Sequence, residues 1–263
     1  MMIEALTPAD CRWDAVAQYA STCSWRAGQT LAQQMRSEYF QDWERVFAAF
    51  TPEGDVAGYC TLAARDCLPD APYSPYIGMV FVGEAHRGHR LSERLLQYAS
   101  DYAASLGFSR VFLVSDHEGL YEKYGFLKAD ERPAPWDPAT VETIFFRHTG
   151  RLPDVSPIIG RRVAGHIDRP MGSRHPRAGF LYPVNYGYAD GVMAADGDEQ
   201  DVYLLGINAP VSNFEGRVIA VYHRFDDVED KWIVTPEGRD LPDEVILEQI
   251  AFQEQFFHGQ LLR

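Results

Sequence analysis

A basic, glycine-containing segment at residues 86–92 has the composition of an anion-binding loop. It lies between an apolar run and an amphipathic stretch, so we expect it to lead into a helix. The first N–H groups of a helix lack intrahelical acceptors, its dipole favours negative charge, and arginines add directional donors for phosphate oxygens. Two interpretations are open at this point: a phosphate-binding loop, or a basic turn that caps the helix.

An acidic run offers a second kind of chemistry. Asp196, Asp198 and Asp201 surround a glycine directly before a strand-like run. Carboxylates so spaced can point at one spot, and hard oxygen ligands suit Mg²⁺ or Mn²⁺. The alternative is a solvated acidic turn, which is the commoner outcome for such a sequence taken alone.

The composition is that of a globular protein and limits its partners. The chain has 263 residues, of which 46% are hydrophobic and 24% charged, enough for two domains. A net charge of −14 argues against a broad basic face, so nucleic acid is not an expected partner. No window approaches the roughly 18 apolar residues of a membrane span, and residues 1–6 lack the pattern of a signal peptide. We therefore expect no membrane partner, a cytoplasmic location, and reduced thiols at the four cysteines, Cys11, Cys23, Cys60 and Cys67.

Strand-like and helix-like segments alternate over residues 1–149. Continuous apolar runs predict buried strands, and a turn-flanked pair of runs predicts a hairpin. Leucines and tyrosines at helical spacing predict an amphipathic helix up to Gly107. The result is a mixed α/β (α+β) sheet flanked by helices. The expected strands cover residues 3–6, 46–50, 56–64, 76–83, 111–114 and 141–146; the expected helices cover two stretches before residue 39, residues 91–106 and a short segment at 118–124.

The pattern changes after residue 149. Residues 150–157 contain two prolines and are expected to be a linker. In the part from 158 to 263, short strand-like runs such as 202–205 and 218–222 are broken by Gly, Pro and Asp. This pattern predicts a small barrel of antiparallel strands followed by a helix over about 242–257.

The strand, loop and helix around residues 76–106 resemble the acetyl-CoA-binding core of the GNAT superfamily of N-acetyltransferases, whose loop runs Arg/Gln-x-x-Gly-x-Gly/Ala. Arg87 fits the first position, Arg90 stands where the first glycine is usual, and Ser92 replaces the last small residue. The resemblance extends over residues 1–149 and implies a GNAT fold with acetyl-CoA as the acyl donor. The cofactor-binding positions that it implies are Val82, Arg87, Gly88, His89, Arg90, Leu91 and Ser92.

A second matching segment lies at residues 120–126. Tyr121 is similar in position to the GNAT tyrosine that protonates the departing CoA thiolate. A phenol has an unperturbed pKa of about 10, comparable to that of a thiol, so this proton transfer is chemically reasonable. The alternative is that Tyr121 serves only in packing.

Transfer to a small-molecule amine also needs a base for the acceptor's ammonium group. Four residues lie near the ends of the strands that border the expected site, and the sequence does not choose among them: Glu84, Asp66, Asp116 and His117. Residues 23–28, with the helices around them, are expected to line the acceptor side.

Residues 158–263 resemble the soluble inorganic pyrophosphatases, a family with an OB-like five-stranded barrel. The shared motifs are a Tyr-Pro-x-x-Tyr-Gly run at 182–187, an Asp-Gly-Asp-x-x-Asp signature at 196–201 and an acidic segment with its lysine at 225–234. The resemblance implies a Mg²⁺ or Mn²⁺ cage made by Asp196, Asp198, Asp201, Glu229 and one or both of Asp226 and Asp227. It also makes Asp198 the base for the attacking water. It implies that Lys231 holds a phosphate and that Tyr186 is hydrogen-bonded to a phosphate or to a metal-bound water.

The second region departs from that family at two places. The family's arginine-bearing hairpin is reduced here to residues 174–179, so Arg174 or Arg177 is the expected substitute, and the C-terminal Tyr-Lys clamp has no match. Two hypotheses follow. The chain is an N-acetyltransferase joined to a Mg²⁺-dependent inorganic pyrophosphatase, or its second domain is a non-catalytic module that binds a phosphorylated ligand or forms a homodimer. The retained aspartates favour the first and the reduced hairpin favours the second.

Overall fold

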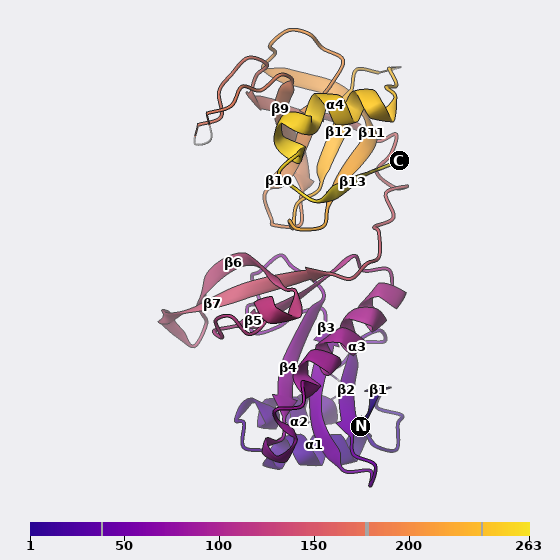
Figure 1. Cartoon of the computed structure of the whole chain (residues 1–263), viewed down its shortest axis with the longest axis vertical. Coiled ribbons are helices and arrows are strands. Elements are labelled where there is room, and N and C mark those ends of the chain that lie inside the picture. Colours follow the sequence, from indigo (N-terminus) through magenta and orange to yellow (C-terminus); the bar gives the residue numbers. More distant parts are fainter. Residues whose placement is uncertain (38, 177–178, 238) are drawn as a thin grey trace. The chain divides into compact units, whose positions relative to one another are not determined.

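The computed structural model describes residues 1–37, 39–176, 179–237 and 239–263. The chain forms two compact units, Met1–Pro153 and Asp154–Arg263 (Figure 1). Within the described residues, no helix is long and apolar enough to cross a membrane.

A mixed sheet of seven strands forms the first unit, in the order β1-β2-β3-β4-β5-β7-β6. Neighbouring strands are antiparallel except β4 and β5, which are parallel. The strands are β1 (Met2–Leu6), β2 (Arg45–Phe50), β3 (Val56–Ala63), β4 (Tyr76–Val82), β5 (Arg110–Ser115), β6 (Leu127–Ala134) and β7 (Asp137–His148). The predicted mixed sheet is confirmed.

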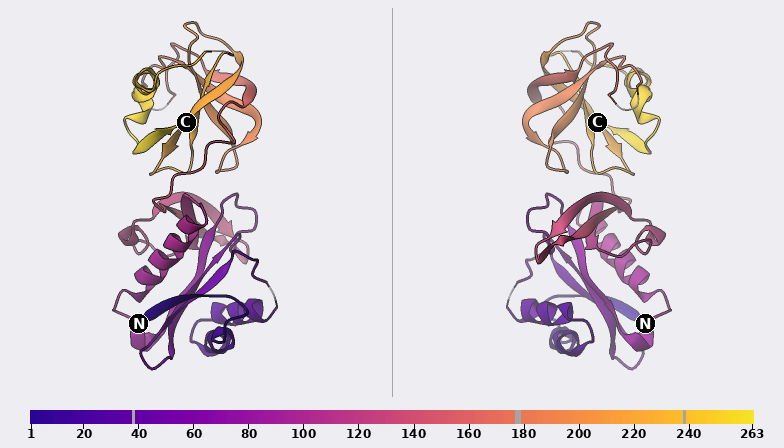
Figure 2. Two further views of the ribbon diagram at one scale, coloured as in Figure 1. Left: turned by 90° about the vertical axis from the view of Figure 1, so that its right-hand side faces the viewer. Right: turned by 90° about the vertical axis from the view of Figure 1, so that its left-hand side faces the viewer.

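Helices cover both faces of this sheet (Figure 2). Helices α1 (Trp13–Thr22) and α2 (Ala27–Arg36) bury apolar residues against one face, and α3 (Leu91–Ser105) does so against the other. Side chains of α3 spaced by three or four residues are buried, as the sequence pattern predicts. Because both faces are covered, the central strands can be apolar throughout, and this explains their continuous hydrophobic runs.

Two features of the first unit differ from the sequence prediction. The helix expected at residues 118–124 is a single 3₁₀ turn, Glu122–Tyr124, because Gly119 (φ 71°) and Gly125 (φ 81°) adopt left-handed conformations on both sides of it. Strand β6 was not predicted. It is rich in charged residues, three of them consecutive (Asp130, Glu131 and Arg132), and contains Pro133, a composition typical of an edge strand.

The second unit is a closed barrel built from β8 (Arg162–Arg169), β9 (Asn185–Met193), β10 (Glu199–Leu204), β11 (Asn213–Arg224) and β12 (Lys231–Thr235). The order is β12-β10-β9-β8-β11, and β11 pairs with β12 to close it. Helix α4 (Asp243–Glu254) follows, and β13 (Gly259–Leu262) adds to β11. The predicted small barrel followed by a C-terminal helix is confirmed.

One pair of barrel strands contradicts the expectation of a wholly antiparallel barrel. Strands β10 and β12 are parallel, whereas the other neighbours are antiparallel. The reason is geometric, since directions cannot alternate around a closed ring with an odd number of strands.

Candidate functional site

Strands β4 and β5 separate in the middle of the first unit's sheet. They share one register pair, Tyr76 with Phe112. Further along, the pairing of β4 with β3 slips between Gly78 and Phe81, and Met79 has a φ of 50°. This bulge turns the β4 backbone locally, a device found beside many active sites. The expected acyl-donor site borders this part of β4.

The loop between β4 and α3 has the geometry of an anion site. Gly88 (φ 81°) and Arg90 (φ 55°) both adopt the left-handed conformation. Glycine, the residue usual at this position in the GNAT loop, adopts this conformation without strain. For Arg90 the same conformation costs about 1–2 kcal/mol. No described side chain caps the first turn of α3. The N–H groups of that turn are therefore available to an anion.

The other loop residues have separate roles. Arg87 donates from Nε to the Val82 carbonyl (3.1 Å) and from a terminal nitrogen to Glu84 (3.0 Å), so it holds the loop against the end of β4. The side chain of Leu91 is buried in the core, so only its backbone can contact a ligand. The Oγ atom of Ser92 lies 3.2 Å from the Tyr124 hydroxyl. His89 is exposed. Their contacts with acetyl-CoA remain predictions.

Tyr121 lies at the start of the 3₁₀ turn, and its ring packs against Phe126 and Phe145. Its hydroxyl is hydrogen-bonded to Ser115, the last residue of β5. Burial raises the pKa of Tyr121 above the usual phenol value, and the Ser115 hydrogen bond opposes this in part. The phenol therefore stays protonated at neutral pH, as a proton donor must.

Arg147 on β7 anchors the turn that carries Tyr121. Its guanidinium donates to the Tyr124 carbonyl (3.0 Å) and to Ser100 Oγ on α3 (2.5 Å), and it stacks over the Phe126 ring. Arg147 and Ser115 carry no signal in the sequence. Both come from strands that flank the turn in space, and neither belongs to a motif.

Three of the four candidate bases are exposed. Glu84 accepts hydrogen bonds from Ser24 and Arg87, and the Ser24 hydrogen bond is the largest cause of the lowered pKa of Glu84. Asp116 and His117 are exposed and lie 3.0 Å apart, Oδ1 to Nδ1. Asp66 differs, because its carboxyl is half-buried beside β4.

The expected acceptor-side segment, residues 23–28, is attached to β3 and β4. Cys23 Sγ lies 3.4 Å from the Tyr59 hydroxyl. The Trp25 ring stacks on Phe81 with 6.2 Å between centroids. With the Ser24 contact to Glu84, these interactions fix the segment over the bulged end of β4.

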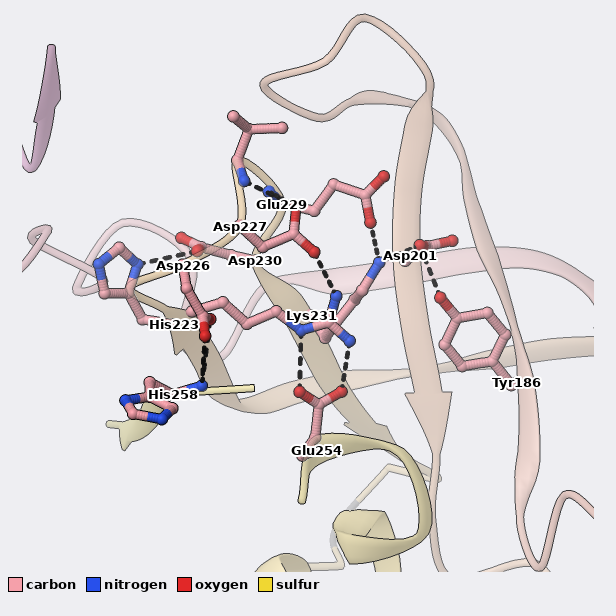
Figure 3. Close-up of polar contacts among 12 residues, drawn as sticks. Tyr186, Asp201, His223, Asp226, Asp227, Glu229, Asp230, Lys231, Glu254 and His258 are labelled. Carbon is pink, nitrogen blue, oxygen red and sulfur yellow. Dashed lines mark hydrogen bonds and ion pairs between the residues drawn. The ribbon is translucent and has the colours of Figure 1, made fainter. Parts of the chain in front are cut away.

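The barrel assembles part of its predicted site (Figure 3). Tyr186 on β9 donates to Asp201 Oδ2 on β10 (2.6 Å). Lys231 on β12, 2% exposed, contacts Asp201 and Glu229 through its ammonium group. Burial raises the pKa of Glu229, and the nearby Lys231 charge opposes that shift. Asp196 is hydrogen-bonded to Glu229, so five predicted residues meet here.

The remaining predicted residues of the barrel that the structure describes make other contacts. Asp226 accepts the His258 N–H (3.0 and 3.1 Å) and Asp227 accepts from Arg224 (2.7 Å), so both are engaged near the C-terminal segment. Asp198 lies in the β9–β10 turn, where its N–H donates to Asp196 (3.0 Å). Arg174 donates to the Gly179 carbonyl within its own loop (3.0 Å). Arg177 lies outside the described residues.

The fit to a divalent cation is partial. In the described part of the chain, no three His, Cys, Asp or Glu side chains stand in a metal-binding arrangement. The carboxylates nearest to such an arrangement are Asp196, Asp201 and Glu229, with Asp198 in the adjoining turn. Because Lys231 already contacts two of them, a cation would compete with its ammonium group.

A buried ion pair beneath this cluster joins α4 to the barrel. Arg224 (2% exposed) donates to both oxygens of Glu254 (4% exposed) at 2.8 and 2.7 Å. The Tyr203 hydroxyl donates to Glu254 (2.5 Å), and the Arg224 guanidinium stacks on Phe257. The partners lie far apart in the sequence, so no local pattern indicated the pair.

The comparison with family models decides the class of the first unit. Residues 13–126 match the model described as the acetyltransferase (GNAT) family. These residues form a GNAT acetyltransferase domain. The match ends at Phe126, so the second unit lies outside it.

The GNAT domain is also similar to solved structures. An aminoglycoside 6'-acetyltransferase type Ii is 17% identical with a TM-score of 0.46, over 58% of this chain and 100% of that one. An aminoglycoside 6'-N-acetyltransferase from Enterococcus faecium is 14% identical with a TM-score of 0.47, over 59% and 100%. A spermidine/spermine N-acetyltransferase from Vibrio cholerae is 14% identical with a TM-score of 0.41, over 56% and 92%. A search of curated proteins gives no match.

Proposed function

We propose that the first unit is an acetyl-CoA-dependent N-acetyltransferase that acts on a small-molecule amine. The observation that carries this proposal is the position of Tyr121. Its protonated hydroxyl is bonded to the end of β5, and its turn is joined through Tyr124 and Ser92 to the uncapped start of α3. A proton donor and a helix start that can bind the CoA pyrophosphate are therefore parts of one connected site. The GNAT family match supports the same activity.

Each part of this site has a role in the proposed reaction. The N–H groups at the start of α3 and the Gly88 backbone would bind the pyrophosphate of acetyl-CoA. Acetyl-CoA is the donor of the activated acetyl group. The bulged β4 backbone orients the pantetheine arm and the thioester. Tyr121 gives its proton to the departing thiolate, while Phe126 and Phe145 hold its ring in place.

The test combines binding and turnover on the intact protein. Calorimetry with CoA is expected to show one site per chain. With acetyl-CoA and a panel of a simple monoamine, spermidine and an aminoglycoside, free thiol is expected to appear only when an amine is present. Absence of both CoA binding and thiol release would refute the proposal.

We propose as a second function that the barrel binds pyrophosphate or a phosphorylated small molecule. The supporting observation is Lys231, a buried ammonium group held between Asp201 and Glu229 and joined through Asp201 to Tyr186. An ammonium and a phenol can donate to phosphate oxygens. If a Mg²⁺ ion displaced the Lys231 ammonium group, oxygen ligands would come from Asp196, Asp198, Asp201 and Glu229, and the ion would activate water and shield phosphate charge.

Pyrophosphate hydrolysis is the sharpest assay for the barrel. Phosphate release from pyrophosphate with Mg²⁺ is measured for the intact protein, for Asp198→Asn and for the control Asp190→Asn, whose carboxylate is paired with His166. Release that is lost in Asp198→Asn alone supports a hydrolase. Calorimetric binding of pyrophosphate without release supports a binding module. Neither binding nor release would refute a phosphate site in the barrel.

A further inference from the structure

Asp66 lies in the loop between β3 and β4 with its carboxylate against the β4 backbone. A Cβ atom at Gly78 would lie 2.5 Å from Asp66 Oδ2 and 3.3 Å from Thr61 Oγ1. The glycine therefore allows the carboxylate to reach the strand, one residue before the bulge at Met79. The Cys67 N–H donates to Asp66 Oδ1 (2.6 Å) and fixes the orientation of the carboxylate.

A buried hydroxyl without a partner lies in the same region. Tyr76 is 1% exposed, and its hydroxyl has no hydrogen-bond partner among the residues that the structure describes. After burial, the Asp66 charge has the largest effect on Tyr76. An unsatisfied buried hydroxyl costs about 1–3 kcal/mol, so one that persists beside a carboxylate indicates a place for a polar ligand atom.

The proton donor Tyr121 is close enough to this region for the Asp66 charge to affect it. Strand β4 itself has the sequence YIGMVFV and contains no carboxylate or histidine. Any base that acts at its bulge must therefore come from a neighbouring element. The titratable groups that interact with Asp66 come from its own loop, from β4, from the Tyr121 turn and from β7: Cys67, Tyr76, Tyr121 and Glu142.

We propose that the Asp66 carboxylate is the general base that takes a proton from the ammonium group of the acceptor, with the Tyr76 hydroxyl orienting the amine. This inference rests on the transferase function proposed above. Removal of the proton gives a neutral amine, whose nitrogen forms a bond to the acetyl carbonyl carbon. The carbon–sulfur bond then breaks, and the thiolate takes the proton of Tyr121.

The protons balance over the cycle. The nitrogen of the new amide loses its second proton, which returns to Tyr121 through water. Asp66 releases the proton that it accepted to solvent. The net products are the acetylated amine, CoA with a free thiol, and one proton, and no oxidant or reductant takes part.

Burial also makes Asp66 a stronger base than an exposed aspartate. Burial is the largest cause of the raised pKa of Asp66, and the hydrogen bond from Cys67 opposes this shift. The base acts in its ionised form, so turnover is expected to fall as the pH drops through the raised pKa. Removal of the carboxylate removes this acid limb.

The experiment compares Asp66→Asn with Asp70→Asn, an exposed aspartate of the same loop. The amine with the highest rate in the panel is used as acceptor. Asp66→Asn is expected to lower kcat about 100- to 10,000-fold and to lose the acid limb of the kcat profile, with the CoA Kd unchanged. Asp66→Glu is expected to keep part of the wild-type kcat. The control Asp70→Asn is expected to keep all of it.

Each other outcome overturns a stated claim. Wild-type kcat in Asp66→Asn, or a lower kcat with an unchanged acid limb, would overturn the assignment of the base. A weakened CoA Kd in Asp66→Asn would show a structural role and overturn it as well. If the wild-type protein binds no CoA and releases no thiol with any amine, the transferase function itself fails, and the assignment fails with it.

Discussion

Removing the charge of Glu254 is expected to loosen α4 from the barrel. In Glu254→Gln the side chain keeps its shape, but the Arg224 guanidinium, which is 2% exposed, loses the charge of one carboxylate partner and keeps that of Asp227. The variant also weakens the acceptor of the Tyr203 hydroxyl. Breaking a buried ion pair by changing one partner typically costs about 3–5 kcal/mol. At about 1.4 kcal/mol per factor of ten, local opening becomes about two to four orders of magnitude more frequent.

Hydrogen exchange of the intact protein measures this opening where it occurs. Amides of α4 and of the part of β11 around Arg224 are expected to exchange faster by that factor, while those of α3 in the first unit are unchanged. Glu248→Gln is the matched control, because Glu248 is exposed on the same helix, and its effect should stay within about 0.5 kcal/mol. Equal exchange of α4 in the two variants would refute the view that the ion pair fastens the helix.

Two further predictions concern the first unit. Because burial raises the pKa of Tyr121 above the usual phenol value of about 10, most of the phenol stays protonated below that pH, so kcat should show no alkaline loss there. An alkaline limb centred below pH 9 would contradict the assignment. Arg90→Gly should raise the free energy of unfolding of this unit by about 1 kcal/mol, because glycine adopts a φ of 55° without strain, and urea unfolding that shows a loss would count against strain at this position.

The sequence predicted elements with strong periodicity well. Strands β4 and β5 and helix α3 were found because their apolar spacing extends over several residues and both faces of the sheet are covered. Strand β6 was missed because this edge strand has three consecutive charged residues and a proline, and so lacks the apolar pattern of a buried strand. The prediction of a helix before Gly125 was wrong, because Gly119 and Gly125 adopt left-handed conformations that limit this segment to a single turn.

The sites show a similar division. Motif residues such as Tyr121 and Asp201 could be named, because their spacing along the chain carries the signal. Contacts between distant segments could not be predicted. Asp226 accepts an N–H from His258. Asp227 pairs with Arg224, which in turn binds Glu254 on α4. The role of Gly78 had one sequence signal, a glycine inside an apolar strand, which often marks a close approach.

The central claim is that Tyr121 is the proton donor of an acetyl transfer to an amine. The most direct measurement is kcat for Tyr121→Phe with acetyl-CoA, beside Tyr98→Phe, whose ring is exposed on α3. Packing on Phe126 and Phe145 is retained, so the CoA Kd should not change, while kcat should fall about 100- to 10,000-fold. Tyr98→Phe should match the wild-type protein. Turnover by Tyr121→Phe at the wild-type rate would contradict the account.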